Sequence, residues 1–173
     1  VINNDISRVD NVKRNPEKTK RLLRSYARSI GTQSKISSLS QDVNPSGDSE
    51  IASNPTIMDY IEALKKIFVL EDSRAWNPNL RSKTAIRTSD TRYFTDPSIA
   101  AAAMELGPDD LINDLNTMGF FFENLCIRDL RIYADALDGT VYHYRDKNGL
   151  ECDAVIHLRG CLLYTSDAAD DLT

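Results

Sequence analysis

Residues 119–158 have the sequence GFFFENLCIRDLRIYADALDGTVYHYRDKNGLECDAVIHL, and the rest of the chain can be interpreted from this stretch. On a helical wheel of about 100° per residue, Glu123 falls inside an apolar stripe formed by Cys126, Ile127, Leu130, Ala134 and Leu137. The opposite side of the same helix carries Phe121, Leu125 and Ile132, with a narrow polar wedge of Asn124, Arg128, Arg131 and Asp135 between the two sides. A helix that is apolar on two sides is predicted to be buried, so a carboxylate at Glu123 is costly unless it has a function or a partner.

Two strands are predicted after this helix, at residues 140–144 and 153–158. Asn148 and Gly149 lie between them and are a strong hairpin signal. Glu151 and Asp153 are spaced i, i+2 and therefore share one face of the second strand. Together with Glu123, three carboxylates could converge on one cation.

Three segments carry a resemblance to a known family: GFFFENLCIRDLR at residues 119–131, YHYRDKNGLECDAVI at residues 142–156 and RYFTDPSIAAA at residues 92–102. They resemble the uncharacterised C-terminal domain that is attached to AAA+ ATPase domains in many bacterial and archaeal proteins, and the resemblance spans most of residues 6–158. It implies an α+β fold with an α/β core like that of PD-(D/E)XK nucleases and restriction endonucleases. It also implies an AAA+ ATPase domain upstream in the full-length chain as the partner, and ATP binding only through that domain.

Glu123 and Asp153 match the first two acidic positions of the nuclease-like core, so the resemblance makes them the catalytic and Mg²⁺-binding candidates. The next strand of that family carries a Glu-x-Lys triplet, and no such triplet follows Asp153 in this chain. The ending CLLYTSDAADDLT resembles a peptide translated through a sequencing adaptor. We therefore expect residues 93–160 to be a truncated nuclease-like core without its third strand, and residues 161–173 to be a non-biological tail.

Charge divides the chain into two halves. Residues 1–92 hold 16 Lys and Arg against 11 Asp and Glu, whereas residues 93–173 hold 5 against 15. The basic half is the better candidate for nucleic acid. The composition is that of a soluble protein, no apolar run approaches the roughly 18 residues of a membrane span, and the start has no signal-peptide core, so a cytoplasmic location without a membrane is expected.

Apolar residues at helical spacing predict three helices in the basic half, at residues 17–30, 34–42 and 56–66. A strand at residues 67–70, a basic loop and a returning strand at residues 92–94 would make residues 1–92 a linker and a winged-helix-like segment. In such a module the third helix enters the major groove and the loop contacts the DNA backbone. The nucleic-acid-binding candidates are therefore Lys65, Lys66, Arg81, Lys83 and Arg87.

Several alternatives remain open from the sequence. Glu123 could be satisfied by Arg145 or by a backbone donor inside an inactive nuclease-like fold. His143 and His157 have no second ligand at metal spacing, so core or surface histidines are the default, and Trp76 is expected to pack a turn. As a whole, the chain could be a DNA-interacting nuclease-like domain that acts with an ATPase, or a non-catalytic docking or regulatory module of that ATPase.

Overall fold

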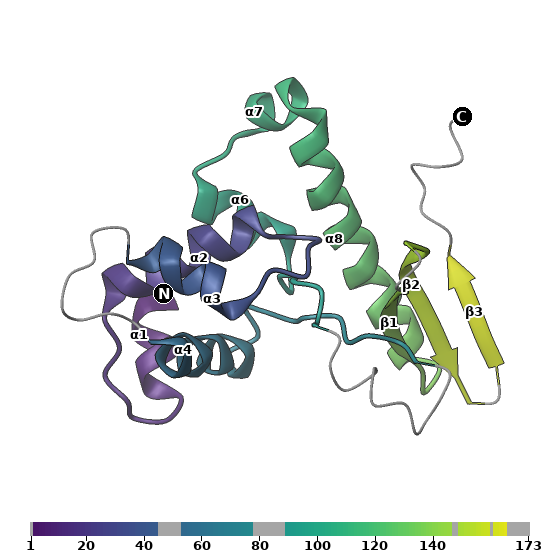
Figure 1. Ribbon diagram of the computed structural model, residues 1–173, viewed down its shortest axis with the longest axis horizontal. Helices are drawn as coiled ribbons and strands as arrows, with labels where there is room; N and C mark the ends of the chain where they lie inside the picture. Colours follow the sequence, from purple (N-terminus) through teal and green to yellow (C-terminus); the bar gives the residue numbers. More distant parts are fainter. Residues whose placement is uncertain (1, 45–52, 78–88, 147–148, 160, 166–173) are drawn as a thin grey trace.

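The computed structural model of the chain describes residues 2–44, 53–77, 89–146, 149–159 and 161–165. Within these residues the fold is α+β, with seven helices and one three-stranded antiparallel sheet. The helices are α1 (Ile2–Arg8), α2 (Pro16–Arg28), α3 (Ile36–Val43), α4 (Asn54–Lys66), α6 (Pro97–Met104), α7 (Pro108–Asn113) and α8 (Leu115–Asp135). The strands are β1 (Thr140–Arg145), β2 (Glu151–Leu158) and β3 (Cys161–Thr165). Helix α8 runs between a body of helices on one side and the sheet on the other (Figure 1).

Helices α1 to α4 form the helical body. Asn15 begins α2, because its side-chain oxygen accepts hydrogen bonds from the backbone nitrogens of Glu17 at 2.9 Å and Lys18 at 3.3 Å. Leu22 and Tyr26 on the inner face of α2 have no exposed surface. The helices predicted at residues 17–30, 34–42 and 56–66 are confirmed to within two residues at each end.

A buried arginine ties the N-terminal segment to α4. The Arg14 side chain is 1% exposed, and its guanidinium donates to Asp10, to Asp59 and to the Ile6 carbonyl oxygen, the last at 2.7 Å. The Asn15 backbone nitrogen also donates to the Tyr60 hydroxyl at 2.9 Å. The first half of α4 is therefore covered by residues 10–15.

After α4 the chain runs out and returns as two extended segments. Residues 69–73 and 91–95 lie antiparallel and are joined by bridges between Leu70 and Phe94 and between Ser73 and Thr91. In place of the strands predicted at residues 67–70 and 92–94, the structure has isolated bridges between these segments. The basic part of the loop that joins them lies outside the described residues. Beyond Ser73, Ala75 pairs in parallel with His143 of β1, so this segment adds to the edge of the sheet.

Helix α8 is anchored to this ladder by a buried amide. Asn124 has no exposed surface, and its side chain accepts from the Phe94 backbone nitrogen at 3.0 Å and donates to the Phe94 carbonyl oxygen at 2.8 Å. The amide thus acts as a strand partner for Phe94. Asn124 belongs to the predicted polar wedge, of which Asn124 is buried, Arg128 and Arg131 are half-buried and Asp135 is exposed.

The prediction that α8 is buried on two sides is wrong. Phe121, Ile127 and Ala134 are buried, but Ile132 is 60% exposed and Leu137 is 64% exposed. Helix α8 packs on α6, α7, β1 and β2, and each of its two apolar sides contains both buried and exposed residues.

The sheet has the order β1-β2-β3. Tyr142 pairs with Val155 and Tyr144 with Cys152, so two residues of β2, Asp153 and Ala154, lie opposite His143 alone. This is the two-against-one register of a β-bulge, which changes the direction of a side chain at that point. The turn after β1 contains Gly149 at φ 89°, while Asn148 lies outside the described residues.

The expectation that no strand follows Gly160 is corrected by β3. Its backbone pairs antiparallel with β2, from Leu158 opposite Cys161 to Ala154 opposite Thr165. Because the sequence of β3 is CLLYT, the third strand is present but supplies neither the Glu nor the Lys of the nuclease-like family.

Candidate functional site

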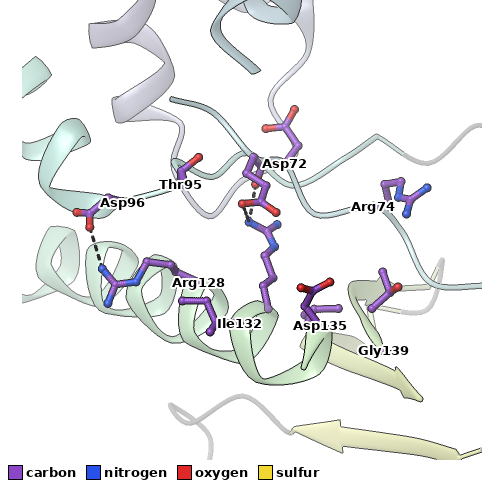
Figure 2. A pocket seen from close by; sticks show the side chains of 12 residues that line it. Asp72, Arg74, Thr95, Asp96, Arg128, Ile132, Asp135 and Gly139 are labelled. Carbon is purple, nitrogen blue, oxygen red and sulfur yellow. Dashed lines mark hydrogen bonds and ion pairs between the residues drawn. The ribbon is translucent and has the colours of Figure 1, made fainter. Parts of the chain in front are cut away.

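A groove separates α8 from the segment that follows α4 (Figure 2). Its volume is about 710 Å³, which is within the range of ligand pockets. The walls are in equal parts polar and apolar, and the lining residues are Glu71, Asp72, Arg74, Thr95, Asp96, Arg128, Arg131, Ile132, Asp135, Gly139, Thr140 and Val141.

The arginines on the α8 wall of the groove are held by the protein itself. Arg128 contacts Asp96 at 2.8 Å and Asp129 at 2.9 Å, as part of the network that Figure 2 shows. Arg131 donates to the Glu71 carbonyl oxygen at 2.7 Å and has a side chain only 13% exposed. Burial lowers the pKa of Arg131, and the nearby Glu71 carboxylate opposes that shift. Both guanidinium groups are thus already used to hold α8 against its neighbours.

The acidic residues Asp72 and Asp96 on the opposite wall of the groove are also paired within the protein. The Asp72 side chain is 2% exposed, accepts a hydrogen bond from the Tyr26 hydroxyl, and pairs with Arg92 at 2.7 Å and Lys65 at 3.2 Å. Hydrogen bonds from Ser98, the second residue of α6, lower the pKa of Asp96, and Arg128 lowers it further. Ion pairs in the groove stabilise the junction of α8 with the segment that follows α4, while Arg131 Nη2 and Thr95 Oγ1 are buried there without a hydrogen-bond partner.

Glu123, the first catalytic candidate, lies at this junction and is half-buried. Its Oε1 accepts a hydrogen bond from the Tyr93 hydroxyl. A Cβ atom at Gly31 would lie 3.2 Å from Glu123 Oε2 and 2.8 Å from the Phe120 ring, and Gly31 has φ 71°, so only glycine fits this close approach. Burial and then the Glu123 carboxylate raise the pKa of Tyr93 far above its usual range, which keeps Tyr93 a hydrogen-bond donor.

Asp153, the second catalytic candidate, lies on the β2 bulge. Its charge also raises the pKa of Tyr93, so Glu123 and Asp153 act on a common neighbour. Glu151 instead pairs with Arg145 at 3.4 Å, both on the surface. Arg145 is therefore the partner of Glu151, and the alternative that it pairs with Glu123 is wrong.

The expected cluster of three carboxylates is not formed in the described part of the chain. Within it no group of three or more His, Cys, Asp or Glu side chains could hold a metal ion. The carboxylates predicted to bind Mg²⁺ near Tyr93 are Glu123 and Asp153. Protein sites for this ion combine carboxylates with further oxygen ligands.

The basic candidates are only partly placed. Lys65 pairs with Asp72 and, at 3.5 Å, with Glu62, whereas Lys66 is exposed at the end of α4. Arg81, Lys83 and Arg87 lie outside the described residues. In the helix-turn-helix geometry the N-terminal residues of the third helix contact bases. In the middle of α4, Asp59 and Tyr60 are bonded to residues 14 and 15.

The two histidines differ in their surroundings. His143 is 3% exposed and its Nδ1 lies 2.9 Å from the Ser73 carbonyl oxygen, so the expectation of a core histidine is confirmed for this residue. Because a carbonyl only accepts, Nδ1 carries the proton, and Nε2 is buried without a hydrogen-bond partner. Burial lowers the pKa of His143. His157 is exposed and stacks on Trp76, whose ring also lies 5.4 Å from Tyr142.

The surface that sequence patterns missed is an apolar stripe along α8. We define the α8 stripe as the exposed residues Leu115, Met118, Phe122, Ile132 and Tyr133. They fall within about 100° of the helix circumference, on the side opposite the buried Asn124 and Ile127. Leu115 is 70% exposed and Phe122 is 58% exposed, although large apolar side chains normally leave water. The sequence feature that could have indicated this surface is the apolar character of both sides of the helix. It was interpreted as burial, because the sequence alone does not show an exposed apolar side.

Within the described residues, no helix combines the length and the apolar character needed to cross a membrane. Residues 1–110 match a protein family described as Domain of unknown function (DUF8612), and since this is more than half of the chain, the protein belongs to that family. The match ends before α8 begins. Neither the curated proteins nor the solved structures contain a significant match.

Proposed function

We propose that this chain is a non-catalytic docking module that binds a partner protein through the α8 stripe, and that the partner is an AAA+ ATPase. The observation that carries the proposal is the exposure of five large apolar side chains along one side of α8. Exposed apolar surface of this kind, rimmed by polar residues, is typical of protein interaction sites. The identity of the ATPase partner rests on the resemblance of residues 6–158 to the domain attached to AAA+ proteins.

The surroundings of Glu123 favour docking over catalysis. A metal ligand needs free lone pairs directed at the ion, but Glu123 accepts from Tyr93 and its second oxygen lies against Gly31. The groove supports the same proposal, because its arginines hold α8 in place; Ile132 lies at the edge of the groove, and the rest of the α8 stripe lies outside it.

The test uses the AAA+ ATPase domain that this proposal places upstream in the full-length chain. Binding of that domain to the present chain is measured by isothermal titration calorimetry, for the parent and for a variant with Phe122→Ser and Ile132→Ser. We expect the double variant to bind at least about tenfold more weakly, because central apolar side chains carry most of the energy of an interface.

The matched control is Met58→Ser on α4, which removes a side chain that is 53% exposed but lies outside the stripe. It should bind like the parent. Equal affinity of the parent and the double variant, or absence of binding by the parent, would refute docking through α8.

A second candidate is the DNA-interacting nuclease-like domain with a winged-helix-like segment, and one observation favours it. Glu123 and Asp153 both raise the pKa of Tyr93, so the two carboxylates of the nuclease-like pair lie in one neighbourhood. This candidate requires Mg²⁺ to raise the melting temperature of the parent and Glu123→Gln to abolish that increase. It also requires DNA cleavage to depend on Mg²⁺ and on Glu123. Docking alone predicts no effect of Mg²⁺ on any of these proteins.

A further inference from the structure

We infer that the α8 stripe takes an amphipathic helix of basic charge, contributed by a partner protein. The inference rests on the proposed docking function and adds the chemistry of the partner. Two properties of the surface carry it: the spacing of the apolar residues and the charge around them.

The apolar spacing is that of a helix-binding seam. Four stripe residues, Leu115, Met118, Phe122 and Ile132, and the half-buried Leu125 follow the three-and-four spacing of heptad a and d positions, in which Asp129 is the one polar residue. Helix α8 has 21 residues, and at about 1.5 Å per residue the seam from Leu115 to Ile132 is about 25 Å long. A long, straight apolar seam on one helix matches the apolar face of a second helix better than it matches a loop or a small molecule.

The surroundings of the seam are acidic. Residues 107–139 contain seven Asp or Glu and two Arg, a net charge of −5. Both arginines are committed elsewhere, Arg128 to Asp96 and Asp129, and Arg131 to Glu71. The exposed acidic residues lie at the two ends of α8: Asp109, Asp110 and Asp114 before it, and Asp138 after it, with Asp135 in its last turn at the groove. A partner with lysine or arginine beside its apolar face would gain charge complementarity, which raises the association rate and excludes other partners.

The same charge weighs against two other occupants. A second copy of this chain would bring two surfaces of −5 together, and in a parallel pair Asp129 would lie against itself. Nucleic acid would meet acidic residues where it needs lysine and arginine.

The experiment compares two fluorescent helical peptides of the length of α8, 21 residues, with leucine at every a and d position. One carries lysine and the other glutamate at the remaining positions, and fluorescence anisotropy measures binding to the full chain. We expect the lysine peptide to bind at least about tenfold more tightly at about 0.05 M salt, and this preference to shrink at about 0.3 M salt.

Variants separate the apolar and the charge contributions. The neutral pair Phe122→Ser and Ile132→Ser should weaken the lysine peptide about tenfold or more, while Met58→Ser leaves it unchanged. Asp135→Asn with Asp138→Asn should weaken it several-fold at low salt only. Asparagine suits position 138, where φ is 54°.

Three outcomes would overturn the inference: equal binding of the two peptides, no binding of either, or lysine-peptide binding that ignores the serine variants. Light scattering that shows a dimer of the parent, dissolved by the serine pair, would assign the stripe to a second copy and equally overturn it. If the ATPase domain still binds through α8 in any of these cases, docking stands and only the basic helical partner is wrong.

Discussion

The helical body of α1 to α4 differs from the region of α7 and α8 in where charged and apolar side chains lie. In the body, charged side chains are buried with partners, as Arg14 is with Asp10 and Asp59. Along α7 and α8 and just beyond, eight of the twelve large exposed apolar side chains among the described residues fall between residues 112 and 137, although Phe120 lies toward Gly31. They are Ile112, Leu115, Met118, Phe120, Phe122, Ile132, Tyr133 and Leu137.

From this difference we expect buried, hydrogen-bonded residues to determine stability and the α8 stripe to determine binding. Substitutions at buried, hydrogen-bonded residues should change the free energy of unfolding, because they leave polar groups without partners. Substitutions on the α8 stripe should change partner affinity and leave the free energy of unfolding nearly the same. The family match, which covers residues 1–110, includes the helical body and stops before the stripe.

The largest expected effect on stability is at Asn124, which links the two regions. Asn124→Ala should lower the free energy of unfolding by about 3 kcal/mol, because the buried Phe94 nitrogen and carbonyl oxygen both lose their partner. Urea unfolding followed by circular dichroism measures the change. Asn116→Ala, at an exposed position of the same helix, is the control and should cost less than about 0.5 kcal/mol. A loss at Asn124 no larger than that of the control would break the comparison.

A medium effect is expected at the pair of Tyr93 and Glu123. Glu123→Gln replaces a charged acceptor by a neutral one and should lower the free energy of unfolding by about 1 to 2 kcal/mol. A double-mutant cycle with Tyr93→Phe should give a coupling energy of similar size. A Glu123→Gln protein that is as stable as the parent or more so would point instead to an unpaired carboxylate kept for metal binding.

The smallest effect is a pH dependence from His143. Its pKa is lowered in the folded protein, where burial outweighs the opposing effects of Ser73, Asp90 and Glu151. The unfolded state therefore binds the proton more readily, and the free energy of unfolding should fall as pH decreases below about 6.5, by at most about 1.4 kcal/mol per pH unit.

Urea midpoints between about pH 7.5 and 5 measure this slope, a window above the range in which ordinary Asp and Glu titrate. His143→Gln should remove it, and the exposed His157→Gln should retain it. A slope that persists in His143→Gln would assign the proton uptake to another group.

Much of the fold could be predicted from local patterns. The helices of the body, the end of α4 at Lys66 and the hairpin of β1 and β2 follow from apolar spacing, caps and turn residues. The arrangement around α8 could not be predicted, because it depends on distant partners. Asn124 bonds to Phe94 and Glu123 accepts from Tyr93, each 30 residues away. A helical wheel shows two apolar sides but does not show which one the rest of the chain covers.

The pairing of residues 73–75 with β1 has a consequence for how the protein folds. The ring of His143 bonds to the Ser73 carbonyl oxygen across a separation of 70 residues, and Ala75 bridges to His143 directly. Contacts between distant residues slow folding, because a long loop must close before any energy is gained. During synthesis the helices α1 to α4 can pack as soon as they have emerged, but residues 74–76 must wait for β1. Before β1 is synthesised, the backbone of residues 74–76 is an open strand edge. In this interval a chaperone or another nascent chain could pair with these residues.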